Sequence, residues 1–148
     1  RSIDWSTLVA IGASFSVGKA MESTGAAAYV AQTLLGPLQG LGPWAALAGI
    51  YLLTLLFTEL VTNNAAASLA FPIAQATAAA LGVSFMPFAV CLAMAASCGF
   101  ATPLGYQTHL MVYGPGGYRF SDFVRIGVPL DGIIMIAAVA LAPLVFPF

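Results

Sequence analysis

Charged residues are scarce in this chain: they make up 6% of its 148 residues, whereas a soluble domain carries about 25%. Four Lys or Arg, five Asp or Glu and one His cannot cover the surface of a soluble globule, which excludes soluble enzymes and disordered tails. No basic stripe is present, so nucleic acid is excluded as a partner. With 61% hydrophobic residues and a mean hydropathy of +0.99, the composition predicts a polytopic membrane protein or a piece of one, lying in a lipid bilayer.

The few charges lie near the two ends of the chain. The flanking charges are Arg1, Asp4, Lys19 and Glu22 at the front and Arg119, Asp122, Arg125 and Asp131 at the back. Between Ser23 and Tyr118 the only formal charge is Glu59. The chain starts with Arg and shows no signal peptide, so we expect it to be an excerpt from a longer polypeptide.

Reactive side chains are equally rare. Cys91 and Cys98 are the only cysteines, and seven residues of helix separate them by about 10 Å, too far for a disulfide. No Ser/His/Asp or Cys/His set is present, and Asp122 and Asp131 are expected at the ends of elements, so the chain is not predicted to be an enzyme. His109 has no Cys, Asp or Glu at ligand spacing and is expected to be a neutral, hydrogen-bonded side chain rather than a metal ligand.

Apolar runs without strand-like alternation predict an all-α membrane protein. We expect the whole chain, residues 1–148, to be one half of a transmembrane domain with four parts. These are a broken helical segment over 5–37, a helical hairpin over 43–81, a broken helix over 88–113 and a final helix over 121–148. Gly36 to Pro43 is the clear loop of the first half, and Ser121 is the expected N-cap of the final helix, with Asp122 in its first turn.

The first informative interruption is Thr62-Asn63-Asn64. It joins two apolar runs without charge, Gly or Pro, and the run before it, 44–57, is short for a full crossing. This pattern favours a re-entrant hairpin whose non-helical tip lies within the bilayer, although an ordinary interfacial turn is the alternative. Glu59 just before the tip is a functional candidate, or else a headgroup-level anchor or the partner of a basic residue outside the chain.

The second interruption is Ala101-Thr102-Pro103. Pro103 lacks an amide hydrogen, so the helix that begins near Phe88 is expected to stop after Ala101, with Gly99 and Gly105 loosening the same region. A hairpin tip with amide side chains beside a broken helix is the arrangement with which transporters hold cations and anions. A structural kink is the alternative.

The stretches "FTELVTNNAAA" and "ATPLGYQTHLMVYGPGGYRFSDFVRIGVPL" resemble the second half of a divalent anion:sodium symporter, a family of the ion transporter superfamily with a citrate-transporter-like domain. The resemblance covers nearly the whole chain. It implies two inverted repeats, each with a re-entrant hairpin and an unwound helix. It also implies an N-terminal half of the same transporter as partner, a homodimer and an elevator motion.

Carried over to this sequence, the family pattern implies a sodium site and an adjoining substrate site. The implied sodium ligands are Thr58, Asn63 and the carbonyls of Val61 and Ala101, and the implied substrate contacts are Thr62, Asn63, Asn64, Thr102 and Pro103. Thr62 and Asn64 depart from the family's Ser-Asn-Thr tip, and His109 stands where related permeases often have Asn. These departures bear on the identity of the substrate.

The functional prediction is secondary active transport of a small divalent anion (dicarboxylate, citrate or sulfate), with sodium as the coupling ion and no other cofactor, in the bacterial inner membrane. Because no Lys or Arg lies between Ser23 and Tyr118, bound sodium and helix N-termini would have to supply the positive charge for a dianion. One alternative is a cation/proton antiporter or arsenite-type exporter, in which Glu59 carries protons. Another is a non-transporting membrane subunit whose polar residues only pack helices.

Overall fold

The computed structural model describes residues 12, 16, 19–20, 23–103 and 106–148. Within these residues all regular structure is helical, which confirms the predicted all-α class for this part of the chain. The helices in order are α2 (Ala26–Gln39), α3 (Pro43–Leu60), α4 (Asn63–Leu81), α5 (Met86–Ser97), α6 (Gln107–Tyr113) and α7 (Phe120–Val145).

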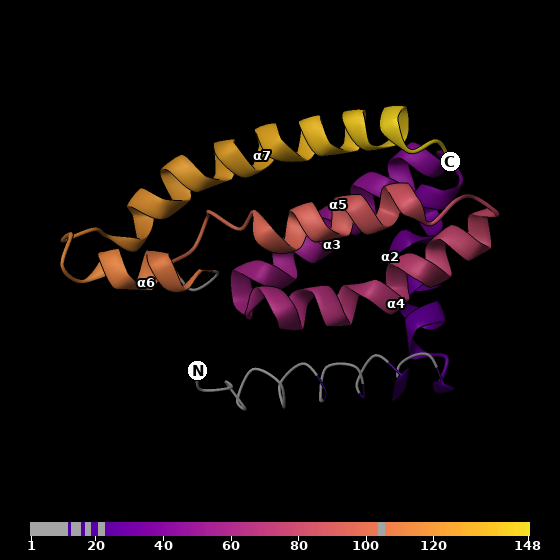
Figure 1. Cartoon of the computed structure of the whole chain (residues 1–148), viewed down its shortest axis with the longest axis horizontal. Coiled ribbons are helices and arrows are strands. Elements are labelled where there is room, and N and C mark those ends of the chain that lie inside the picture. The colour runs from indigo at the N-terminus through magenta and orange to yellow at the C-terminus, as the bar shows by residue number, and fades with distance from the viewer. Residues whose placement is uncertain (1–11, 13–15, 17–18, 21–22, 104–105) are drawn as a thin grey trace, which may run out of the picture.

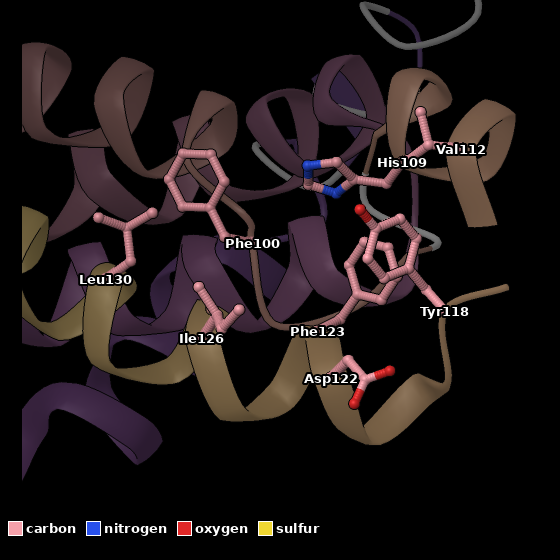
Figure 2. Close-up of a pocket in the computed structure, with 9 residues that line it drawn as sticks. Phe100, His109, Val112, Tyr118, Asp122, Phe123, Ile126 and Leu130 are labelled. Atoms are coloured by element: carbon pink, nitrogen blue, oxygen red, sulfur yellow. The ribbon is translucent and has the colours of Figure 1, made fainter. Parts of the chain in front are cut away.

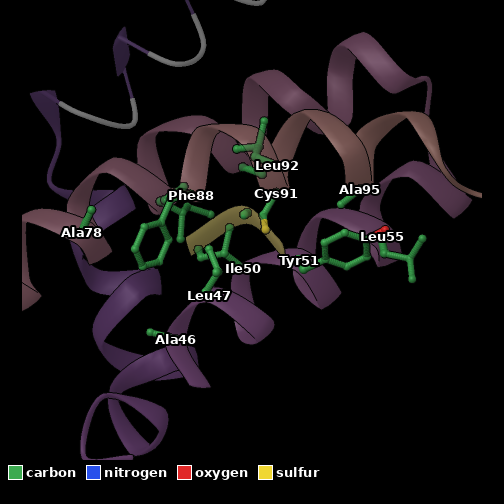
Figure 3. Close-up of a cluster of buried hydrophobic side chains, with 14 residues drawn as sticks. Ala46, Leu47, Ile50, Tyr51, Leu55, Ala78, Phe88, Cys91, Leu92 and Ala95 are labelled. Carbon is green, nitrogen blue, oxygen red and sulfur yellow. The ribbon is translucent and has the colours of Figure 1, made fainter. Parts of the chain in front are cut away.

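Helices α3, α4 and α5 form the packed centre of the molecule. Figure 1 shows α3 and α4 as a hairpin, with α5 beside both. Large side chains from α3 and α5, among them Leu47, Tyr51 and Phe88, fill the core (Figure 3). The buried residues of α4 include four alanines at four-residue spacing, Ala66, Ala70, Ala74 and Ala78, together with Pro72, Ile73 and Thr77. Small residues at this spacing let neighbouring helices approach closely, as they do in membrane proteins.

Helix α7 lies along one side of this centre, against α5 and α3 (Figure 1). Its sequence stays apolar over 26 residues, yet only four of its residues are buried. Exposed large side chains include Ile133, Ile136 and Leu144. A helix with so much apolar surface left open suits lipid or further protein as its surroundings.

Two of the described helices, α3 and α7, are long and apolar enough to cross a membrane. Helix α3 runs for 18 residues because it continues through Thr58, Glu59 and Leu60, beyond the apolar run that ends at Phe57. The shortness that favoured a re-entrant helix therefore belongs to the apolar run and not to the helix itself.

Several expected boundaries are wrong by a few residues. Helix α2 continues through Gly36 and Pro37 to Gln39, so the loop before α3 is confined to residues 40–42. Pro37 has no N–H to donate to the carbonyl four residues earlier, so the last turn of α2 forms with one backbone bond fewer. The remainder of the expected segment 5–37 lies largely outside the described residues.

The expected N-cap of the final helix is also wrong. The cap is Arg119, not Ser121, because the Asp122 carboxylate accepts a hydrogen bond of 2.7 Å from the Arg119 N–H. Asp122 does lie in the first turn of α7, as predicted, where a carboxylate is favourable.

Candidate functional site

The first break separates α3 from α4 and consists of Val61 and Thr62 alone. Both residues are extended, and the Val61 N–H still donates to the Phe57 carbonyl at 2.9 Å. Asn63 and Asn64 were expected in a non-helical tip, but they form the first turn of α4. The helix begins this early because the Thr62 carbonyl already accepts the Ala66 N–H at 2.9 Å.

The second break separates α5 from α6. Helix α5 ends at Ser97, four residues before the predicted end at Ala101. The ring of Pro103 would oppose the carbonyl of Gly99, four residues earlier, so a helix cannot run through this segment. Gly99 also lies directly against α3, since a Cβ at this position would sit 2.7 Å from the Thr58 methyl group.

The two breaks satisfy each other's exposed backbone groups. The Thr58 hydroxyl donates to the Ala96 carbonyl at 2.8 Å, and the Thr102 hydroxyl donates to the Glu59 carbonyl at 2.9 Å. Both carbonyls lie in the last turn of a helix, where no intrahelical donor remains. In a membrane no bulk water replaces such donors. Two segments some 40 residues apart in the chain are therefore one structural unit.

Two buried carboxylates complete this unit. The Ala101 N–H donates to Glu59 Oε1 at 2.9 Å, and the Phe100 N–H donates to Asp131 Oδ1 at 3.2 Å. Glu59 is 8% exposed and Asp131 4% exposed. Glu59 is therefore bonded to the backbone of the second break, and its pairing with a basic residue outside the chain stays a prediction. Asp131 lies in the interior of α7 and not at the end of an element as expected.

Sequence reasoning missed Asp131 as a site residue, although a signal was available. Gly127 and Asp131 are four residues apart and thus lie on one face of α7. At Gly127 an added Cβ would collide with the Phe100 carbonyl, so this face touches the backbone of the second break. An acidic residue one helical turn after a glycine, within a long apolar run, is the sequence pattern that could have identified Asp131.

The predicted sodium ligands lie mostly within this unit. Thr58 is fully buried, and its hydroxyl lies 3.1 Å from the Asn63 side-chain oxygen. Ala101 is held against α3 through Glu59, and Val61 belongs to the first break, with its side chain exposed. Their role as ligands stays a prediction.

The predicted substrate residues divide between the two breaks. Thr62 and Asn64 are exposed at the start of α4, whereas Thr102 is half-buried and Pro103 buried in the second break. The structure thus brings Thr102 to α3, while nothing in the described contacts joins Thr62 or Asn64 to the second break.

His109 lies on α6 beside the second break. Its Nδ1 is 3.4 Å from the Thr102 carbonyl, and its ring packs near Phe100 and Phe123, with centroids 6.2 and 5.5 Å away. Figure 2 shows these side chains around a cavity of about 350 Å³, whose lining also includes Tyr118. The setting is that of a hydrogen-bonded, aromatic-packed histidine.

Apolar helices with two breaks that are joined by Thr hydroxyls and held by buried carboxylates indicate a membrane transport protein as the class. A model of the citrate transporter family matches residues 1–95. The chain belongs to this family and is part of an integral membrane protein.

Curated relatives agree with this assignment. The uncharacterized transporter YfbS of Escherichia coli is 38% identical over 148 residues, which are 100% of this chain and 24% of the relative. Sodium/sulfate cotransporter 1 of Chlamydomonas reinhardtii is 40% identical over 139 residues (93% of this chain, 16% of the relative). The sodium-dependent dicarboxylate transporter SdcS of Staphylococcus saprophyticus is 26% identical over 141 residues (94% and 27%). The chain thus spans about a quarter or less of these relatives, and the predicted resemblance to divalent anion:sodium symporters is confirmed.

Proposed function

We propose that the chain is the second repeat of a transporter that couples the movement of a small divalent anion, a dicarboxylate, citrate or sulfate, to sodium. The observation that carries the proposal is the reciprocal bonding of the two helix breaks, Thr58 to Ala96 and Thr102 to Glu59. Relatives named for sodium/sulfate and sodium-dependent dicarboxylate transport support the same substrates.

Sodium binding is supported by the oxygen atoms gathered at the first break. The Thr58 hydroxyl lies within donating distance of two oxygens, the Ala96 carbonyl at 2.8 Å and the Asn63 side-chain oxygen at 3.1 Å. Three oxygen atoms are thus gathered at this point of the structure. We assign the carbonyls of Val61 and Ala101 as the further ligands, because hard cations prefer oxygen donors.

Anion binding is supported by the start of α4. Thr62 is its N-cap but makes no side-chain capping bond, so the amides of the first turn point toward the tip with the positive end of the helix dipole. Thr62 and Asn64 are the exposed polar side chains there. Since no Lys or Arg lies between Ser23 and Tyr118, sodium contributes the remaining positive charge, which makes anion binding depend on sodium.

The family resemblance supports a proposal for the larger assembly. We place the α3–α4 hairpin as a re-entrant element and the segment between α5 and α6 as the unwound part of a transmembrane helix. An N-terminal repeat of the same transporter completes the site, two copies form a dimer, and an elevator motion carries the site across the membrane. For a bacterial source the location is the inner membrane.

The proposal is tested by sodium-driven uptake of sulfate and succinate into proteoliposomes that contain the complete transporter. Asn63→Ala is expected to lower sodium-stimulated uptake at least about tenfold, the loss typical of removing a buried polar contact to a charge. Ser68→Ala is the matched control, because among the described residues the Ser68 hydroxyl bonds to the Asn64 carbonyl of its own helix alone, at 2.7 Å. Unchanged uptake in Asn63→Ala contradicts the assigned site.

A second candidate is exchange of a cation for protons, favoured by one observation. Glu59 Oε2 is buried without a hydrogen-bond partner among the described residues, and Glu59 and Asp131 line the same cavity. If Glu59 carries protons, Glu59→Gln abolishes transport. If sodium-coupled anion uptake persists in Glu59→Gln, proton exchange through this residue is excluded.

A further inference from the structure

The backbone of the second break is held by side chains from two different helices. The segment leaves two consecutive amides, those of Phe100 and Ala101, without helical acceptors. Asp131 on α7 accepts the first and Glu59 on α3 accepts the second. An unsatisfied amide in a membrane interior costs several kcal/mol, so these two carboxylates decide where the segment lies.

Glu59 accepts hydrogen bonds from both Ala101 and the residue that follows it. Its side chain takes the Ala101 N–H, and its main-chain carbonyl takes the Thr102 hydroxyl. The Phe100 carbonyl, which shares a planar peptide unit with the Ala101 N–H, lies against Gly127. With the flanking groups fixed, the two backbone dihedrals of Ala101 have little freedom, and the direction of its carbonyl is set.

We propose that Glu59 and Asp131 form a clamp that fixes the Phe100–Ala101 backbone and thereby orients the Ala101 carbonyl toward sodium. Both are positioning residues, acting through the backbone and not as ligands. This inference rests on the proposed function, since it assigns the reason that Ala101 can serve as a sodium ligand.

The surroundings of the two carboxylates favour a clamp over a direct ion site. They share a cavity of about 270 Å³ whose other lining side chains are apolar, such as Leu52, Leu56 and Met135. Such side chains offer no oxygen to complete the shell of a cation. Each carboxylate instead places one oxygen on a backbone amide of the second break.

The clamp predicts that the acceptor oxygen matters and the charge does not. Glu59→Gln and Asp131→Asn keep an oxygen acceptor, so the sodium concentration for half-maximal uptake by the complete transporter should change less than about threefold. Glu59→Ala and Asp131→Ala remove the acceptor and should raise it about tenfold. The KM for the anion at saturating sodium should stay unchanged, which a general loss of folding does not produce.

Control variants separate the clamp from other carboxylate effects. Asp122→Ala removes an exposed carboxylate that also accepts a backbone N–H, that of Arg119, and should leave the sodium dependence unchanged. Glu59→Asp keeps the charge but shortens the side chain by one methylene. Because the shorter side chain does not reach the Ala101 amide, Glu59→Asp should raise the half-saturating sodium concentration. This variant provides the test if the alanine variants do not fold.

Hydrogen–deuterium exchange tests the clamp without a measurement of transport. The amides of Phe100 and Ala101 should exchange about tenfold faster in the alanine variants than in the wild type. Faster exchange in a protein that shows no sodium-driven uptake supports the clamp while it refutes the proposed function. The clamp is overturned if exchange and half-saturating sodium stay unchanged in both alanine variants. Amide variants as impaired as the alanine variants also overturn it, because the charge would then be the active feature.

Discussion

Gly127 is the position where the contact between α7 and the second break is most sensitive to a single methyl group. A Cβ there would collide with the Phe100 carbonyl and carbonyl carbon. That peptide cannot retreat easily, because Asp131 and Glu59 hold its flanking amides. Gly127→Ala therefore forces α7 away from the break or displaces the break itself.

The magnitude follows from comparison with Gly132 on the same helix, where a Cβ would meet nothing within 4 Å. Both substitutions gain helix propensity of about 1 kcal/mol, so this term cancels between them. What remains is the overpacking cost, about 1–3 kcal/mol or more against rigid backbone. Gly127→Ala should thus unfold several degrees below Gly132→Ala, at about 2–4 °C per kcal/mol.

The assay is thermal unfolding of the purified complete transporter in detergent, followed by tryptophan fluorescence, with sodium-driven uptake measured on the same preparations. Gly132→Ala should match or exceed the wild type in unfolding temperature and retain uptake. If Gly127→Ala is as stable and as active as Gly132→Ala, the close approach of α7 to Phe100 is refuted.

Three further predictions concern buried positions near the same unit. Thr58→Val removes the donor to a buried carbonyl of another helix and should lower the free energy of unfolding by about 1–3 kcal/mol. Thr54→Val loses a bond within α3 and should lower this free energy less. If denaturation shows the same decrease in the free energy of unfolding for both variants, the bond between the breaks is contradicted. Gly99→Ala places a Cβ 2.7 Å from the Thr58 methyl and should impair sodium-driven uptake, while Gly114→Ala, with open space around it, should not. Tyr51→Phe removes a buried hydroxyl that has no partner within the part of the chain that the structure describes. It should leave the unfolding temperature unchanged or raise it, and a marked decrease would show that this hydroxyl is hydrogen-bonded in the protein.

Local signals in the sequence predicted the helices and located the first break well. The scarcity of charge and the absence of strand-like alternation were sufficient for the all-α class. Thr62 and its two following asparagines marked the α3–α4 junction to within two residues, because short polar side chains favour helix starts. The length of α3 was underestimated, since buried Thr58 and Glu59 belong to the helix although they are polar.

Pro103 predicted the second break from the sequence, but the early end of α5 at Ser97 and the partners of the break depended on contacts that no local pattern encodes. The α5 helix ends before Gly99 where that residue meets the Thr58 methyl, more than 35 residues away along the chain. Asp131 was expected at the end of an element because charges usually lie there. It is tolerated inside α7 because the broken segment offers it the Phe100 amide. The pairing of donors and acceptors between distant segments therefore required the structure.

Equilibrium binding of radioactive sodium to the purified complete transporter tests most directly whether the two breaks form one sodium site. Thr58→Val alters the first break and Gly99→Ala the second, and both should weaken sodium binding about tenfold, as expected when an oxygen ligand is lost or displaced. Thr54→Val should bind sodium like the wild type. Sodium affinity that is unchanged in both Thr58→Val and Gly99→Ala would contradict a shared site.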